Sequence, residues 1–202
     1  MKIGLLGGSF NPAHAGHVYL SKQALKRLGL DQVWWIISPQ NPLKEKKEIA
    51  DYALRVQKAR EIAAKYPQIK ICEVEAEQGF QYTIDTLRYV IEKYFQHRFL
   101  WLMGADNLLQ FHQWKSWQEI FALLPIAVFD RGILGEQSAL KSEAAQQFAD
   151  KRLRRGYKQL VDAPAPCWVY VLMPKHSESA TRLRNMLGKD AFLLHNAESI
   201  NT

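Results

Sequence analysis

MKIGLLGGSFNPAHAGH, residues 1–17, places an apolar run, two adjacent glycines and two histidines directly before a segment of helical period. The run at residues 2–6 has the aliphatic side chains of a buried strand. Gly7 and Gly8 let the backbone approach a ligand closely, and a helix that starts near His17 offers unpaired N–H groups that suit phosphate. The segment therefore predicts a strand, a phosphate-binding turn and a helix.

The same alternation of strand and helix continues along the chain. Apolar runs that predict strands lie at residues 2–6, 32–37, 69–74, 99–103, 126–129 and 168–172. The segments between them carry apolar helix faces, formed by Val18, Leu20, Ala24, Leu25 and Leu28, by Ala53, Val56, Ala59, Ile62 and Ala63, and by Ile84, Leu87, Ile91 and Phe95 within 83–95. This pattern predicts an α/β fold, an open, doubly wound, mostly parallel sheet of Rossmann-like type, with ligands bound outside the carboxyl ends of its strands.

Length and composition restrict the class of protein. The 202 residues predict one domain over 1–202, and 27 Lys and Arg against 20 Asp and Glu give a charge of +7, which favours anionic partners. With 48% hydrophobic and 23% charged residues, disorder and coiled coil are disfavoured, and two cysteines exclude a disulfide scaffold. The apolar run at the amino terminus is too short for a signal peptide, and no run is long enough to span a membrane. We expect a cytoplasmic protein.

The two histidines of the first turn are three residues apart, so His14 and His17 can face the same side of the first helical turn. Imidazole can donate hydrogen bonds to phosphate, and imidazolium can neutralise charge on a phosphoryl oxygen. Metal binding, which lacks a third ligand nearby, and simple helix capping are the alternatives. The glycines do not fit G-x-G-x-x-G, and the chain has no P-loop motif, so redox chemistry with NAD and P-loop hydrolysis are disfavoured.

Two later segments are less specific on their own. Ser179 would cap a helix whose hydroxyls and N–H groups form an anion pocket, and Arg184 has a planar fork that suits phosphate. The alternative is an ordinary capped surface helix. A basic cluster at residues 151–158 is interpreted as a solvated helix face in preference to an anion site.

The motifs together resemble a known group of enzymes. GGSFNPAHAGH, in which His14, Gly16 and His17 form H-x-G-H, is similar to the signature of the nucleotidyltransferase α/β-phosphodiesterase superfamily, and residues 179–184 are similar to its second signature. NPLK at 41–44, YTIDTL at 82–87 and GADNLLQFHQWKSW at 104–117 resemble the bacterial nicotinate-nucleotide adenylyltransferase family. The match spans residues 3 to about 187, and the tail from about 188 is not matched.

The resemblance implies transfer of an adenylyl group from ATP to nicotinate mononucleotide, giving deamido-NAD and pyrophosphate, with Mg²⁺ bound through the ATP phosphates and no protein ligand to the metal. The catalytic residues that it implies are His14, His17, Lys44 and Arg184. It implies ATP contacts from Gly7, Gly8, Ser9, Phe10, His14, His17, Gly104, Asp106, Ser179, Thr181 and Arg184. It implies contacts to nicotinate mononucleotide from Ser9, Asn11, Lys44, Tyr82, Thr83, Asp106, Trp117 and Arg131, with the nicotinate ring against Trp117.

Three alternatives remain at this point. The first is an adenylyltransferase of the same superfamily with another phosphorylated acceptor, either nicotinamide mononucleotide or phosphopantetheine. The second, a nucleic-acid-binding protein, is disfavoured because aromatic and basic residues are not interleaved and no nucleic-acid-binding motif is present. The third, an inactive nucleotide sensor, is disfavoured by the complete set of His14, His17, Lys44 and Arg184.

Overall fold

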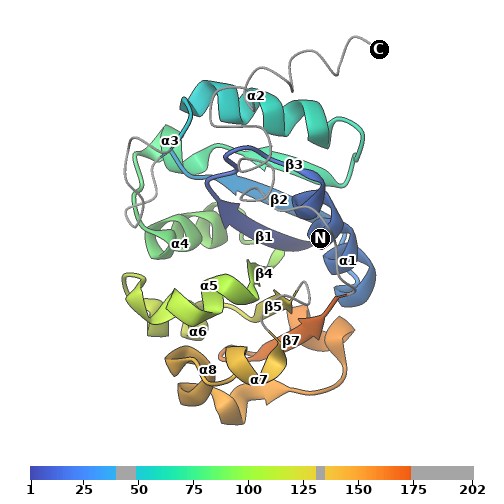
Figure 1. Cartoon of the computed structure of the whole chain (residues 1–202), viewed down its shortest axis with the longest axis vertical. Coiled ribbons are helices and arrows are strands. Elements are labelled where there is room, and N and C mark those ends of the chain that lie inside the picture. Colours follow the sequence, from blue (N-terminus) through green and yellow to red (C-terminus); the bar gives the residue numbers. More distant parts are fainter. Residues whose placement is uncertain (40–48, 131–134, 174–202) are drawn as a thin grey trace.

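A computed structural model of the chain describes residues 1–39, 49–130 and 135–173. Within these ranges the strands form one seven-stranded parallel sheet in the order β3-β2-β1-β4-β5-β7-β6 (Figure 1). The strands are β1 (Lys2–Gly8), β2 (Gln32–Ile37), β3 (Ile69–Cys72), β4 (Arg98–Gly104), β5 (Ile126–Asp130), β6 (Arg152–Leu153) and β7 (Trp168–Leu172). This sheet confirms the predicted doubly wound α/β fold.

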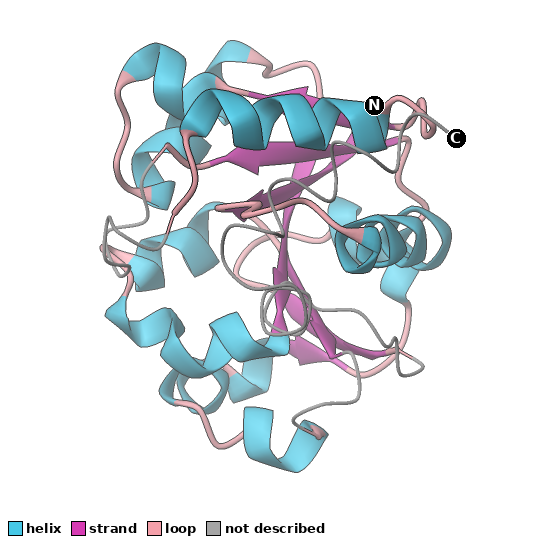
Figure 2. Cartoon of the chain, turned by 45° about the horizontal axis from the view of Figure 1, so that its top comes forward, coloured by secondary structure: helices cyan, strands magenta, loops and turns pink. Residues whose placement is uncertain are grey.

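Helices cover both faces of the sheet (Figure 2). They are α1 (Ala15–Leu28), α2 (Tyr52–Ala63), α3 (Val74–Gln78), α4 (Thr83–Lys93), α5 (Ala105–Gln110), α6 (Trp117–Leu123), α7 (Glu136–Ala139) and α8 (Glu143–Gln147), with 3₁₀ turns η2 (Phe111–Gln113), η3 (Ala149–Lys151) and η4 (Tyr157–Asp162). No helix among the described residues is both long and apolar enough to cross a membrane.

Side chains alternate along each strand between two apolar layers. On β1, Leu6 packs in the layer that holds Val18 of α1, whereas Leu5 packs in the layer that holds Leu87 of α4. The central strands are therefore apolar on both faces, because parallel sheets bury both. This explains why the strands are readable in the sequence as continuous apolar runs.

The six predicted strands are all present, and the corrections concern element ends. The strand expected at 69–74 ends at Cys72, because Val74 already begins α3. Ala53, expected on the apolar face of α2, is exposed in the first turn of that helix. Phe95 lies beyond the end of α4 and is 83% exposed, so it does not continue the apolar face of that helix.

The basic cluster at 151–158 is not a helix face. Arg152 and Leu153 form β6, a two-residue edge strand that pairs with β7 and that the sequence pattern did not predict. The guanidinium of Arg152 pairs with Glu136 and lies 5.5 Å from the centre of the Trp168 ring. At this position the arginine is held by a carboxylate and an aromatic face, whereas Arg154 is exposed to solvent.

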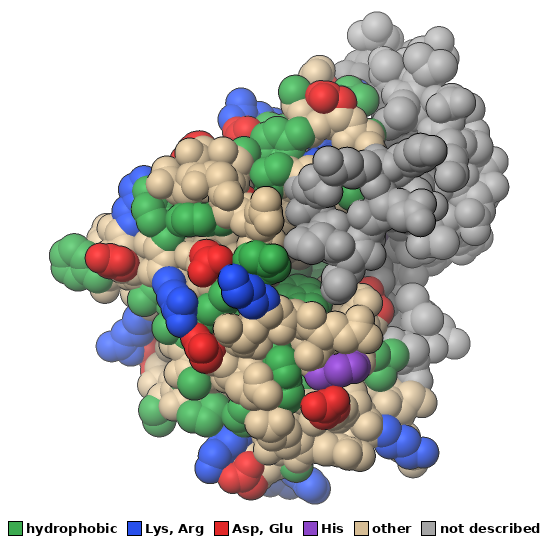
Figure 3. Space-filling view, turned by 90° about the vertical axis from the view of Figure 1, so that its left-hand side faces the viewer, with side chains coloured by type: hydrophobic (Ala, Val, Ile, Leu, Met, Phe, Trp, Pro, Cys, Tyr) green, Lys and Arg blue, Asp and Glu red, His purple; other side chains and the backbone are tan. Residues whose placement is uncertain are grey.

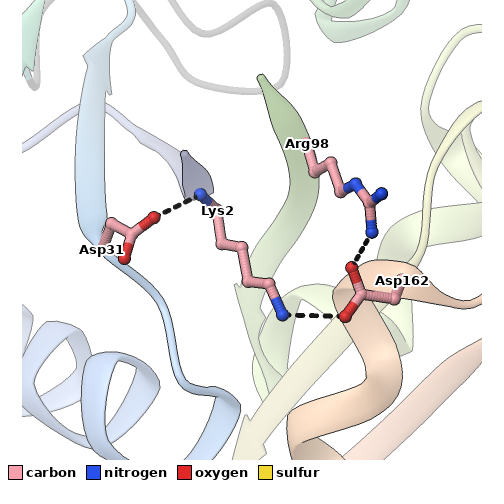
Figure 4. A network of polar contacts seen from close by, with 4 residues as sticks. All are labelled: Lys2, Asp31, Arg98 and Asp162. Carbon is pink, nitrogen blue, oxygen red and sulfur yellow. Dashed lines mark hydrogen bonds and ion pairs between the residues drawn. The ribbon is translucent and has the colours of Figure 1, made fainter. Parts of the chain in front are cut away.

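A polar network joins the amino ends of β1 and β4 to η4 (Figure 4). The backbone N–H of Lys2 donates to Asp31 at 2.7 Å, and the Lys2 ammonium lies 2.7 Å from a carboxylate oxygen of Asp162. Arg98, the neighbour of Lys2 in the sheet, pairs with the other oxygen of Asp162. The network lies at the end of the strands opposite the glycine turn, so the carboxyl edge of the sheet is left for ligands.

We predict that Gly7→Ala destabilises the fold and that Gly8→Ala does not. A Cβ on Gly7 would lie 2.4 Å from Cη2 of Trp101, a rigid ring that is 2% exposed, so the ring or the strand would have to shift. Overpacking of this kind costs about 1–3 kcal/mol of unfolding free energy. At Gly8 the nearest side-chain atom would be 3.5 Å away, an ordinary contact. Urea unfolding of both variants measures the difference, and equal effects would contradict the packing argument.

Candidate functional site

A cavity of about 330 Å³ opens at the carboxyl ends of β1, β2 and β4, where the fold predicts a ligand. Its walls come from segments that are far apart in the sequence. They are Gly7, Gly8, Ser38, Glu75, Gln81, Tyr82, Thr83, Trp101, Asn107, Gln113, Trp114 and Lys115. We call this cavity the acceptor pocket. The predicted residues Gly7, Gly8, Tyr82 and Thr83 all line it.

The turn after β1 leads directly from the pocket to the start of α1. Phe10 has a φ of 43°, and its ring is buried, with ring centres 5.0 Å from Trp35 and 4.6 Å from His17. The Phe10 side chain, expected near ATP, is therefore part of the core, and its ring lies against His17. This packing holds the second histidine of the motif in place.

The two histidines cap α1 through a reciprocal pair of hydrogen bonds. The N–H of Gly16 donates to Nδ1 of His14 at 3.0 Å, and the N–H of His14 donates to Nδ1 of His17 at 3.2 Å. A ring nitrogen that accepts a hydrogen bond carries no proton, so this geometry fits the imidazole tautomer with its proton on Nε2 in both rings. Both rings therefore take part in capping, and their expected contacts to phosphate stay predictions; with Nδ1 used in the cap, a neutral ring donates from Nε2–H.

Arg55 of α2 is a buried cation that the sequence analysis missed. Its side chain is 2% exposed and donates to the carbonyl oxygens of Ser9, Ser38, Pro39 and Ala50. Burial lowers the pKa of the guanidinium, which nevertheless stays charged, as arginine does in proteins. Arg55 thus fastens the turn after β1 to the end of β2. The signal for it was an arginine one residue before Val56 on the apolar face of the predicted helix.

Asn11 has a structural contact in the same region. Its side-chain oxygen accepts a hydrogen bond from the backbone N–H of Ala50 at 3.1 Å. That contact, together with the bond from Arg55 to the carbonyl of Ala50, ties the segment before α2 to the glycine turn. The expected contact of Asn11 with the mononucleotide is not visible in this arrangement and stays a prediction.

Glu75 places a buried carboxyl group in the pocket wall. It is 5% exposed, and it accepts hydrogen bonds from the hydroxyl groups of Thr86, at 3.1 Å, and Ser38. Burial raises the pKa of this carboxyl, and the two hydroxyl donors offset only part of the increase. The sequence analysis did not select Glu75, because one glutamate among several in 73–77 carries no sign of burial.

The tryptophans of the segment 111–117 lie differently from what we expected. Trp114 lines the acceptor pocket, with its ring centre 6.3 Å from that of Trp101. Trp117 is 5% exposed and packs in the core against Phe111, Phe121 and Phe148. Trp117 thus lies in the core and not in the wall of the acceptor pocket, whereas we expected it beside the ligand. Trp117 begins α6 and turns to the core, whereas Trp114 follows η2 in extended conformation.

Gly104 and Asp106 meet at the end of β4, beside the pocket residue Asn107. A Cβ on Gly104 would lie 2.3 Å from Oδ1 of Asp106, so a glycine allows the carboxylate to fold back onto the strand end. The side chain of Asp106 is exposed there. The other expected site residues, Lys44, Arg131, Ser179, Thr181 and Arg184, lie outside the described residues, and their roles stay predictions. In the described part of the chain, no group of three or more His, Cys, Asp or Glu side chains could hold a metal ion.

Comparison with known proteins gives consistent results. A family model described as "Cytidylyltransferase-like" matches residues 5–186. A "Probable nicotinate-nucleotide adenylyltransferase" of Bradyrhizobium sp. (strain ORS 278) is 47% identical, over 92% of this chain and 96% of that protein. A protein with the same description from Methylorubrum extorquens (strain PA1) is 43% identical, over 91% of this chain and 99% of that protein. The nicotinic acid mononucleotide adenylyltransferase of Plasmodium falciparum, solved with NaAD, is similar in fold, with a TM-score of 0.68 and 18% sequence identity. The match covers 92% of this chain and 83% of that chain.

We predict that Glu75→Gln becomes more stable relative to the wild type as the pH rises. The folded protein holds the Glu75 proton more tightly than the unfolded chain does. Its contribution to stability is therefore complete below the ordinary pKa, 4.5, and is lost as the pH rises through the elevated pKa of the folded state. Glutamine does not titrate. Urea unfolding between about pH 4.5 and 8 measures this, with Glu77→Gln, exposed on the same helix, as the control.

Proposed function

We propose a reaction for this chain on the premise that it belongs to the cytidylyltransferase-like family, and within that family to the nicotinate-nucleotide adenylyltransferases. It transfers the adenylyl group of ATP to nicotinate mononucleotide, forming deamido-NAD and pyrophosphate in NAD biosynthesis. The structural observation that carries this assignment is the H-x-G-H segment, whose histidines cap α1 next to a pocket large enough for the base of a mononucleotide.

The transfer needs no protein nucleophile. A phosphate oxygen of nicotinate mononucleotide attacks the α-phosphorus of ATP, the new P–O bond forms, and the bond to the β-phosphate oxygen breaks, so that pyrophosphate leaves. Catalysis then consists of positioning the two phosphates and stabilising the charge on their oxygens. The glycine turn and the amino terminus of α1 supply backbone N–H groups for this purpose.

The histidines have a defined part in this scheme. Nδ1 of His14 and of His17 is used in capping, so each ring is held in the tautomer that donates from Nε2. We assign these two donors to phosphate oxygens, with His14 nearer the α-phosphate and His17 on the triphosphate. Lys44 and Arg184 are proposed to add positive charge. The expectation of an imidazolium ion is not needed, because a neutral ring already donates.

The remaining contacts are assigned by position. We assign backbone atoms of Gly7, Gly8, Ser9 and Phe10, together with Gly104 and Asp106, to ATP, and Ser179 and Thr181 to its phosphates. In the acceptor pocket, the backbone N–H groups of Tyr82 and Thr83 are assigned to the nicotinate carboxylate, and the ring is assigned to Trp114 in place of Trp117. Ser9, Asn11, Asp106 and Arg131 are retained as proposed contacts to the mononucleotide.

Nucleotidyltransferases typically use a divalent metal ion together with the nucleotide. The described residues offer no cluster of acidic or histidine ligands, and a metal held by ATP phosphates and water fits this donor set. We therefore propose that Mg²⁺ enters with ATP and supplies neutralisation of phosphate charge. The reaction is proposed to take place in the cytoplasm.

The surface is consistent with small anionic substrates. On the face that Figure 3 shows, Lys and Arg side chains lie among Asp and Glu side chains and do not gather into one basic stripe. Nucleic-acid-binding surfaces concentrate positive charge along one face. The face drawn therefore does not have the continuous basic stripe that a nucleic-acid backbone would need.

We predict that the purified chain releases pyrophosphate from ATP, Mg²⁺ and nicotinate mononucleotide, and that His17→Ala slows this release. Loss of one well-placed donor to a phosphoryl oxygen costs about 100-fold or more in turnover. A coupled pyrophosphate assay measures the rate, and a thermal melt of the variant establishes that it is folded. Turnover within threefold of the wild type in a folded variant would contradict the role of His17.

A second prediction separates the two tryptophans. Trp114→Ala should raise the KM for nicotinate mononucleotide about tenfold, because the ring loses its aromatic partner, and leave the KM for ATP unchanged. Trp117→Ala should instead lower the unfolding free energy by about 3–5 kcal/mol, as removal of a buried ring does. Steady-state kinetics with urea unfolding distinguishes the two, and the reverse pattern would contradict the placement of the ring.

A further inference from the structure

Two of the side chains that line the acceptor pocket are charged, and they come from different elements. Glu75 lies on α3, and Lys115 lies between η2 and α6. Neither is used by the transfer step described above. Within the described part of the chain neither forms an ion pair with another residue. A pocket wall that keeps a carboxyl group and an ammonium group without pairing them is prepared for a ligand with charges of its own.

Glu75 is the buried member of this set. Its hydrogen-bond partners, the hydroxyls of Ser38 and Thr86, are neutral. The nearest cationic group along this chain of contacts is Arg55, which donates to the carbonyl of Ser38 and not to the carboxyl itself. A carboxyl group taken out of water with neutral partners costs stability in the free protein. A ligand with a positive charge would offset this cost, which explains why the pocket wall contains the Glu75 carboxyl group.

Lys115 is the exposed member. Its ammonium group lies 4.2 Å from the centre of the Tyr82 ring, a cation–π contact at the start of α4. Tyr82 and Thr83 line the same pocket. The ammonium group therefore lies over the ring of Tyr82, the residue directly before the first turn of that helix. Positive charge and N–H donors together favour an anionic substituent at this wall.

We propose that Glu75 and Lys115 are specificity determinants for the charge of the acceptor's base. Lys115 favours a base with an anionic substituent, and Glu75 favours a ring that is itself cationic. This inference rests on the proposed function. Nicotinate mononucleotide carries both charges, a pyridinium ring and a carboxylate. The base of nicotinamide mononucleotide carries only the pyridinium charge, and the base of reduced nicotinamide mononucleotide carries neither charge.

The physical basis is that charges interact more strongly away from water. Between unit charges at 4 Å the Coulomb energy is about four times larger at an effective dielectric constant of 20 than in bulk water. The Glu75 carboxyl is in such a shielded wall, so a cationic ring placed nearby offsets its desolvation. The carboxylate of the acceptor lies at the wall that holds Lys115, and an amide at that wall gains less.

The test is binding of the three mononucleotides to the full chain by titration calorimetry, with displacement of nicotinate mononucleotide for the weaker ligands. We expect Lys115→Met to weaken nicotinate mononucleotide about tenfold and nicotinamide mononucleotide less than twofold, because the second ligand has no carboxylate. Lys115→Arg, which keeps the charge, should restore the preference. Lys141→Met makes the same change at an exposed position outside the pocket and should change neither Kd.

Glu75→Gln should weaken both pyridinium ligands by a similar factor, about five- to tenfold, and leave the Kd of reduced nicotinamide mononucleotide unchanged. Glu77→Gln, exposed on the same helix, is the matched control. A merely structural role for Glu75 would weaken all three ligands alike. If Glu75→Gln does not fold, the wild type still provides the test, because reduced nicotinamide mononucleotide should then bind at least threefold more weakly than the oxidised form.

Two results would overturn the inference. One concerns the ratio of the Kd for nicotinamide mononucleotide to the Kd for nicotinate mononucleotide: Lys115→Met would change this ratio by less than threefold relative to the wild type. The other is equal binding of oxidised and reduced nicotinamide mononucleotide by the wild type. Failure of the proposed function looks different: the wild type would then release no pyrophosphate with nicotinate mononucleotide, whatever the variants do.

Discussion

The buried guanidinium of Arg55 is the contact on which the site depends. Its hydrogen bonds reach the turn after β1, the end of β2 and the segment before α2, and so continue the contact of β1 with β2 beyond their last pair, Gly8 and Ile37. Carbonyl groups at the carboxyl ends of strands would otherwise need water. The hydrogen-bond partners are neutral carbonyls, and among the described residues Arg55 forms no ion pair, although Asp51 acts on it at longer range, so the guanidinium leaves positive potential beneath the glycine turn. The same side chain thus fixes the glycine turn in place and sets the electrostatic potential beneath it.

The histidine motif joins structure and chemistry in a similar way. His14 and His17 complete the hydrogen bonding at the start of α1, and that requirement alone sets the tautomer of both rings. Phe10 packs beneath His17 and restricts its position. A nucleotidyltransferase that works by positioning, without a covalent intermediate, needs donors whose direction does not change during the reaction. In this chain the direction is imposed by backbone groups of the same turn.

Much of the fold and part of the site could be predicted. The glycine turn, H-x-G-H and the Tyr82–Thr83 pair are local motifs on strand ends or helix starts, and the acceptor pocket lies where the glycines meet the Tyr82–Thr83 pair. Other features have no local pattern. The two-residue strand β6 is too short to show a period, and its pairing with β7 alone defines it. Trp114 and Trp117 are three residues apart, and which of them faces the ligand depends on where η2 ends and α6 begins.

By itself the sequence determined the parallel α/β sheet and the glycine turn, because these follow from hydrophobic period and from contiguous residues, and the resemblance of its motifs to a family indicated the class of reaction. The tertiary structure alone decided the burial of Arg55 and Glu75, the placement of Lys115 over Tyr82, and the choice of Trp114 for the pocket. The physical reason is desolvation. Whether a charged or aromatic side chain contacts a ligand, packs in a core or faces water depends on which distant segments surround it. The linear pattern of residues does not contain that information.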